Sequence, residues 1–168
     1  NTVSCNRSTG GGGYDNCANA SYSFVGGGCS NTASGNNSFI GGGSNNIASD
    51  VSSTVGGGSG NRSCGQNASV AGGSSNIASG FSSTIAGGNS NTASGSRSTV
   101  GGGQGNTASC NYSTVGGGGS VIGPGNCALG NYSTVGGGGG FYQGGNIASG
   151  TASTVGGGGY NCANGNCS

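Results

Sequence analysis

Residues 91–105 read NTASGSRSTVGGGQG, and the next line of the sequence begins NTAS again. Lines that begin with Asn start at residues 1, 16, 31, 46, 61, 76, 91, 106, 126, 146 and 161, so the period is 15 residues except in two lines of 20. Ser recurs at position 8, Val or Ile at position 10, and Gly at positions 12 and 13. A short fixed period of this kind is typical of a solenoid, in which each repeat forms one coil.

Composition favours short strands and narrow coils. Gly supplies 46 of the 168 residues, and the runs of three Gly in most lines would break a helix. The triplets around positions 2 and 9 suit two short strands per coil, separated by Gly-rich turns. We therefore predict an all-β chain, a single repeat domain over 1–168, that forms a parallel β-solenoid of about eleven coils. Val and Ile of position 10 should form one stacked row, and the leading Asn side chains a hydrogen-bonded ladder.

The residue types needed for catalysis or for nucleic acid binding are nearly missing. The sequence has no His and no Lys, and its net charge is +1. General acid–base catalysis therefore lacks its usual groups, the Gly runs lack the Lys of a phosphate loop, and there is no basic stripe for nucleic acid. No apolar run reaches the length of about 18 residues that a membrane span needs. We expect no enzyme, no cofactor, no metal site, no nucleic acid partner and no membrane span.

The eight cysteines suggest disulfides. An even count in a chain of low charge indicates an oxidising, extracellular or cell-surface setting. Cys5 and Cys110 occupy position 5, and Cys17 and Cys127 occupy position 2 of the lines that follow. We therefore predict that Cys5–Cys17 and Cys110–Cys127 staple neighbouring coils.

The other four cysteines have no assigned pairing. Cys162 and Cys167 share the last line, and we expect them to join each other or a neighbouring chain. The pairing of Cys29 and Cys64 does not follow from their positions.

Five Asn-x-Ser sequons share position 6 of the repeat and would line one edge of the solenoid as acceptors for glycans. Because Ser at position 8 is itself structural, any Asn at position 6 also creates a sequon by accident, and both interpretations stay open. The five residues are Asn6, Asn36, Asn111, Asn131 and Asn166.

The two long lines carry insertions at 121–125 and 141–145, after position 15 in consecutive coils. We expect these insertions to protrude side by side and form an exposed apolar patch, which would mark a contact with a partner. The alternative is that they fold back and cover an end of the solenoid. The patch would consist of Val121, Ile122, Pro124, Phe141 and Tyr142.

Two lines carry a resemblance to a known family. NTASGSRSTVGGG (91–103) and NIASGTASTVGGG (146–158) are similar to the head repeats of trimeric autotransporter adhesins, which have the form S-x-A-x-G-x-x-S-x-A-x-G. The resemblance implies a left-handed parallel β-roll and three rolls packed side by side in an adhesive head. The chain departs from this pattern in its Gly-Gly-Gly runs and its cysteines.

Three functions are consistent with the sequence. The first is a structural subunit of an extracellular fibre or surface appendage, because the lines at both ends keep the repeat pattern and end-to-end contacts that do not close generate a fibre. The second, which the resemblance implies, is a head or tail-fibre-like module that binds a surface or glycan ligand as a lateral homotrimer. The third is ice binding, since position 9 carries a row of Thr, although Phe24, Phe39 and Ser69 interrupt it.

Overall fold

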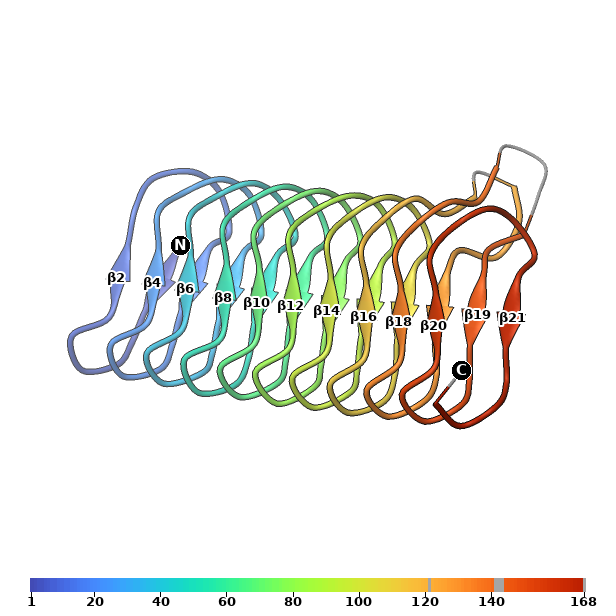
Figure 1. Cartoon of the computed structure of the whole chain (residues 1–168). Coiled ribbons are helices and arrows are strands. Elements are labelled where there is room, and N and C mark those ends of the chain that lie inside the picture. The colour runs from blue at the N-terminus through green and yellow to red at the C-terminus, as the bar shows by residue number, and fades with distance from the viewer. Residues whose placement is uncertain (121, 141–143, 168) are drawn as a thin grey trace.

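The computed structural model describes residues 1–120, 122–140 and 144–167. These residues wind into a rod of stacked coils with the two termini at its opposite ends (Figure 1). Each complete coil contributes one strand to each of two parallel sheets, which confirms the predicted solenoid with two short strands per coil. The described residues contain no helix. At about 4.8 Å per coil, the eleven coils give a rod roughly 50 Å long.

The first sheet, sheet A, has 11 strands from positions 2 and 3 of successive lines. Neighbouring strands pair at the same repeat position, as Ile77 does with Thr92. The strands are β1 (Thr2–Val3), β3 (Cys17–Ala18), β5 (Thr32–Ala33), β7 (Ile47–Ala48), β9 (Arg62–Ser63), β11 (Ile77–Ala78), β13 (Thr92–Ala93), β15 (Thr107–Ala108), β17 (Cys127–Ala128), β19 (Ile147–Ala148) and β21 (Cys162–Ala163).

The second sheet, sheet B, has 10 strands from positions 9 and 10. Its register follows the same rule, with Thr84 opposite Thr99. The strands are β2 (Thr9–Gly10), β4 (Phe24–Val25), β6 (Phe39–Ile40), β8 (Thr54–Val55), β10 (Ser69–Val70), β12 (Thr84–Ile85), β14 (Thr99–Val100), β16 (Thr114–Val115), β18 (Thr134–Val135) and β20 (Thr154–Val155).

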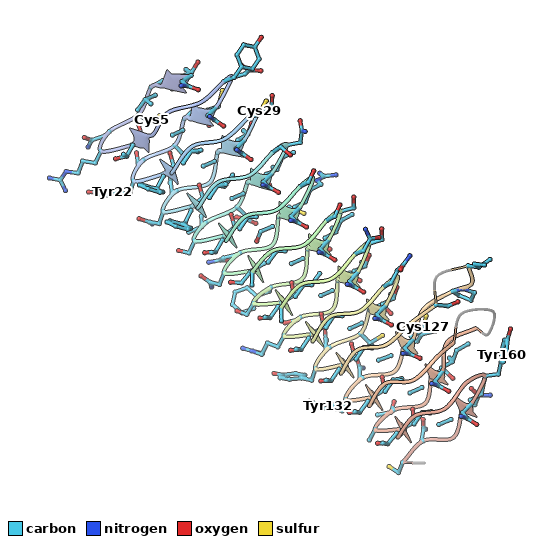
Figure 2. The ribbon with its side chains drawn as sticks, turned by 90° about the horizontal axis from the view of Figure 1, so that it is seen from above. Cys5, Tyr22, Cys29, Cys127, Tyr132 and Tyr160 are labelled. Atoms are coloured by element: carbon cyan, nitrogen blue, oxygen red, sulfur yellow. The ribbon has the colours of Figure 1, made fainter. Side chains whose placement is uncertain are left out.

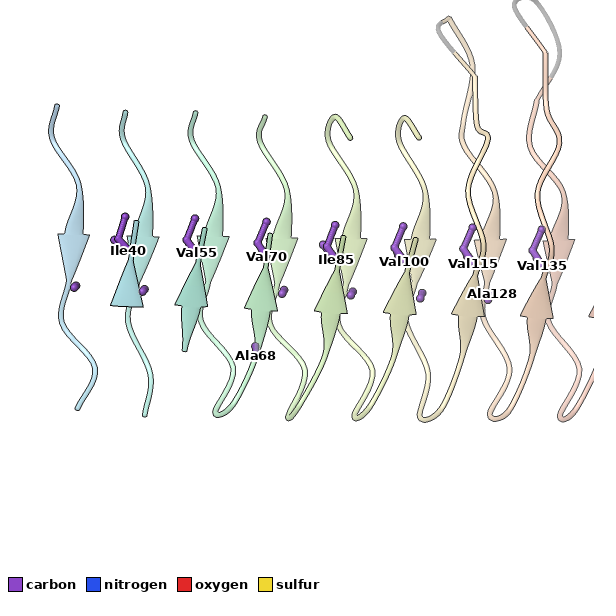
Figure 3. Close-up of a cluster of buried hydrophobic side chains, with 14 of the residues drawn as sticks. Ile40, Val55, Ala68, Val70, Ile85, Val100, Val115, Ala128 and Val135 are labelled. Atoms are coloured by element: carbon purple, nitrogen blue, oxygen red, sulfur yellow. The ribbon is translucent and has the colours of Figure 1, made fainter. Parts of the chain in front are cut away.

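Small side chains from both sheets fill the interior. Ala93 from position 3 and Val100 from position 10 are fully buried, as are their equivalents in the middle coils. The pairing of sheet B carries one row from Val55 through Val100 to Val155, so the predicted row is confirmed (Figure 3). Because each coil buries so little apolar area, the rod relies heavily on hydrogen bonds between coils.

A ladder of Asn side chains, buried from Asn16 to Asn146, runs along the coils, as the sequence predicts. The Asn91 backbone N–H donates to Asn76 Oδ1 at 3.0 Å, and Asn91 Nδ2 donates to the carbonyls of Gly87 at 3.0 Å and Gly103 at 2.9 Å. The glycine carbonyls on either side of this corner are therefore held by one amide. Gly103 has a φ of 83°, and a Cβ there would lie 2.0 Å from the Gly118 carbonyl oxygen, so the corner also requires Gly at position 13.

A third row of contacts between coils follows position 14, and the sequence did not predict it. Single parallel bridges run from Tyr14 through Ser59 to Gly119. Each involves one residue per coil, too short a stretch to leave a strand pattern in the sequence.

Positions 5 to 8 form a four-residue turn that links sheet A to sheet B. The N–H of position 8 donates to the carbonyl of position 5, as Ser83 does to Gly80 at 3.1 Å and Ser53 to Asp50 at 3.1 Å. The residue at position 7 is left-handed in every coil, with φ between 52° and 60°. This is the pattern of a type II turn, which requires a positive φ at its third residue.

The turn occurs in a form that we call the glycine corner. At Gly80 the position 5 N–H donates to the carbonyl of Ala93 in the next coil at 3.2 Å. A Cβ at Gly80 would lie 2.0 Å from the Gly95 carbonyl oxygen, so this form excludes a side chain. The glycine corners are at Gly35, Gly65, Gly80, Gly95, Gly130 and Gly150.

The other form, the side-chain corner, occurs where position 5 carries a side chain. At Asp50 the position 5 N–H donates to Ser53 Oγ of its own turn at 3.3 Å. Ser8 and Ser23 accept the position 5 N–H in the same way. Their Oγ atoms, like that of Ser113, also donate to the position 5 carbonyl at 2.7 Å. The side-chain corners are at Cys5, Ala20, Asp50 and Cys110.

Candidate functional site

Candidate functional groups lie on the outer columns of the rod. The described residues form no pocket and no cluster of three His, Cys, Asp or Glu that could hold a metal ion. Within the same ranges, no helix could cross a membrane. The outward-facing residues at positions 2, 6, 7 and 9 are therefore the groups to consider.

Position 7 forms the most distinctive outer surface, which we call the left-handed column. Its N–H groups join successive coils, as Tyr112 donates to the Ser96 carbonyl at 2.9 Å. A left-handed residue with a side chain costs about 1–2 kcal/mol relative to an ordinary conformation. The chain has 46 Gly, yet none of the eleven column residues is Gly. They are Arg7, Tyr22, Asn37, Ser52, Asn67, Ser82, Arg97, Tyr112, Tyr132, Ala152 and Cys167.

Arg and Tyr side chains stack on one another along this column, on the side of the rod where Tyr22 and Tyr132 lie in Figure 2. The Arg7 guanidinium lies 5.5 Å from the Tyr22 ring centroid and donates to the Tyr22 hydroxyl at 3.0 Å. Arg97 makes the same pair with Tyr112, at 5.3 Å from the ring and with a hydrogen bond to the hydroxyl. Tyr132 continues that stack, with ring centroids 4.9 Å apart and planes within 4°.

Phe81 at position 6 completes the second stack. Its ring centroid is 5.6 Å from the Arg97 guanidinium, which therefore lies between Phe81 and Tyr112. The stack thus spans four successive coils, and its aromatic members remain exposed. The sequence did not single out this column, because positions 1–4, 6, 8 and 9 of the repeat also carry no Gly.

Position 9 presents the Thr row on the outer face of sheet B. Five Thr residues follow one another in register without interruption, from Thr84 to Thr154. Nearer the N terminus, Phe24 and Phe39 replace Thr, and their rings stack at 5.1 Å. The row is therefore flat over half of the rod only.

The predicted disulfides are not present. All eight cysteines are free thiols, including Cys5, Cys17, Cys110 and Cys127. The two predicted pairs occupy the same repeat positions, but this equivalence does not bring the two cysteines of either pair close together. In the structure each position stacks on its own equivalent, so that Cys17 pairs with Thr2 and Cys127 with Thr107.

Positions 2 and 5 are three residues apart along the coil. Three extended residues span about 10 Å, whereas a disulfide needs Cα atoms about 4.4–6.8 Å apart. Cys5 Sγ instead donates to the Asn19 carbonyl at 2.9 Å. The remaining thiols, Cys29, Cys64, Cys162 and Cys167, are also unpaired with each other. Burial raises the pKa of the Cys127 thiol.

The five sequons at position 6 are all exposed: Asn6, Asn36, Asn111, Asn131 and Asn166. Several also have a structural role, because Asn111 Oδ1 accepts the Ser96 N–H and Asn131 Oδ1 accepts the Asn111 N–H, both at 3.2 Å. Glycosylation at these positions stays a prediction.

The two insertions rise from the same edge of the rod (Figure 1). The Gly145 N–H donates to the Pro124 carbonyl at 2.8 Å, which joins the bases of the two loops. Ile122 and Pro124 are exposed, as the predicted apolar patch requires. The other three patch residues, Val121, Phe141 and Tyr142, lie outside the described residues.

Comparisons with known proteins add no relative. No protein-family model matches the chain, and no curated protein matches it in sequence.

Proposed function

We propose that the chain is a structural subunit of an extracellular fibre or surface appendage, in which the coils of one copy stack on the coils of the next. The supporting observation is that successive coils interact through the same set of groups. Thr92 and Ser94 donate to the Asn106 and Ala108 carbonyls at 2.8 and 2.9 Å, and this pattern recurs along sheet A. A coil from another copy would offer the same carbonyls.

The Asn ladder would make such a joint specific. Asn91 accepts the Asn106 N–H at 2.9 Å through Oδ1 and donates its own N–H to Asn76, so each Asn serves both neighbouring coils. A stacked copy in register would extend this ladder, whereas a copy out of register would bury an unpaired amide, which costs about 1–3 kcal/mol. Head-to-tail contacts of this kind do not close and generate a fibre.

The experiment is electron microscopy and light scattering of the purified chain and two variants in the first coil. Thr2 and Ser4 donate to the second coil, so in a parallel ladder the N–H of Val3 faces the opposite, outer side. Val3→Pro removes this one donor and should block stacking. Val3→Ala keeps the donor and loses the same apolar side chain, so it should form filaments as the natural chain does.

Two results would contradict the proposal. One is that the natural chain remains as discrete particles of fixed mass at every concentration. The other is that Val3→Pro forms filaments as readily as Val3→Ala. Circular dichroism of both variants shows whether the solenoid itself has folded.

A second candidate is a head module that binds a surface or glycan ligand as a lateral trimer. The left-handed column favours it, because exposed Arg and Tyr side chains are enriched at binding surfaces. Sedimentation would separate it from the first, since a trimer has a fixed mass.

A further inference from the structure

The Arg–Tyr pair occurs twice on the left-handed column in the same geometry. Arg7 with Tyr22 and Arg97 with Tyr112 each combine a stacked guanidinium with a hydrogen bond to the phenol of the next coil. Six coils separate the two pairs, which corresponds to about 29 Å along the rod. The third arginine, Arg62, lies on the outer face of sheet A and belongs to neither pair.

The positive charges of this column are not neutralised within the chain. Each guanidinium is held by a tyrosine, and no carboxylate among the described residues pairs with Arg7 or Arg97. An Arg has five N–H donors in a planar fork that suits carboxylate and sulfate groups. Because stacking already fixes these two side chains, binding an anion would order them little further.

The residues between the two pairs are small and polar. Asn37, Ser52, Asn67 and Ser82 continue the column with amides and hydroxyls. The stacks end beside small residues, since Asn37 follows Tyr22 and Ala152 follows Tyr132 in the next coil. A flat ring of about one coil's thickness could therefore lie against the outer Tyr face at each end.

We propose that the left-handed column from Arg7 to Tyr132 binds an extended acidic polysaccharide. Its carboxylate or sulfate groups pair with Arg7 and Arg97, its sugar rings lie against Tyr22 and Tyr132, and its hydroxyls bond to the polar residues between them. This assignment explains why the chain keeps side chains at a position whose backbone favours Gly. Binding of a polysaccharide to this column does not require that copies of the chain stack end to end.

The test is binding of polygalacturonate to the immobilised chain at low salt, with dextran and single-stranded DNA as comparison polymers. Arg97→Gln should weaken polygalacturonate binding about tenfold, the effect of losing one charge-assisted contact. Arg62→Gln makes the same change in net charge on sheet A, outside the column, and should alter binding less than about twofold. Dextran, which is neutral, should bind much more weakly than polygalacturonate.

The aromatic part of the site has its own matched pair. Tyr132→Ala should weaken binding several-fold, whereas Tyr160→Ala, an equally exposed tyrosine outside the column, should leave binding unchanged. The proposal is overturned if the natural chain does not bind polygalacturonate, or if Arg62→Gln and Arg97→Gln weaken binding equally. It is also overturned if DNA binds as tightly and Tyr132→Ala has no effect, because simple charge attraction would then account for the binding.

Discussion

The corners at Asp50 and Gly80 turn the chain through the same four positions but satisfy the amide of position 5 differently. At Asp50 this N–H bonds to Ser53 Oγ inside its own turn, whereas at Gly80 it reaches the Ala93 carbonyl of the next coil. In four of the glycine corners the serine hydroxyl has no partner, whereas at Gly130 the N–H of position 5 still donates to Ser133 Oγ at 3.2 Å. Ser83 Oγ is buried and makes no hydrogen bond among the described residues, as is true of Ser38, Ser98 and Ser153.

The difference indicates that the turn depends less on the Ser of position 8 where position 5 is Gly. Coil 61–75 already demonstrates this, because it has the glycine corner Gly65 and carries Ala68 in place of Ser. In that coil Ser63 replaces the usual Ala of position 3, and its Oγ donates to the Ala68 carbonyl at 2.8 Å. In this coil the Ser hydroxyl therefore comes from position 3 and the Ala methyl from position 8, the reverse of most other coils.

The largest expected effect is common to both kinds of coil. Asn46→Ala and Asn76→Ala each remove an amide that holds two glycine carbonyls, and we expect a loss of about 3–5 kcal/mol in the free energy of unfolding. Denaturant titration measures it. If the two losses differ by more than about 1 kcal/mol, the Asn corner depends on the turn that follows it in the same coil, at Asp50 or Gly80, and the two corners are not independent.

Ser53→Ala should have the next largest effect. It leaves the Asp50 N–H without its partner, which costs about 1–3 kcal/mol. The same titration tests it, and Ser53→Thr is the control that keeps the hydroxyl. An unchanged midpoint for Ser53→Ala would mean that the side-chain corner does not use this hydrogen bond.

Ser83→Ala should leave stability within about 0.5 kcal/mol of the natural chain, or raise it, because it replaces an unpaired buried hydroxyl by a methyl group. The contrast with Ser53→Ala is the sharpest test of the comparison. A loss as large as that of Ser53→Ala would show that the two corners use the serine equally.

The smallest effect is expected for Cys110→Ala. Ala20 shows that a side-chain corner accepts Ala, so the change should alter the unfolding free energy by less than about 0.5 kcal/mol. A disulfide at this position would contribute about 2–4 kcal/mol instead. Alkylation of the unfolded chain without reductant gives a second measurement, since eight modified thiols are expected.

The period and the residue types at positions 1, 10 and 13 were enough to predict the coils, the valine row and the Asn ladder. Each of these features depends on one repeat position whose residues stack on one another from coil to coil, so a repeat in the sequence becomes a column in the structure. The pairing of Cys5 with Cys17 failed for the same reason, because it joined two different columns. The residue at position 5 decides which corner forms, but the sequence alone did not show which group would accept its N–H, because that acceptor lies either in the same turn or in the next coil.

The two 20-residue lines leave the coils around them undisturbed. Thr107 still pairs with Cys127 and Val115 with Val135, and Asn126 Nδ2 reaches the Gly117 carbonyl at 2.8 Å across the longer connection. Loop length after position 15 is thus uncoupled from the register of both sheets. A foreign peptide grafted at this place would be displayed at a chosen height along the rod, and grafts in neighbouring coils would be spaced by one coil, about 4.8 Å.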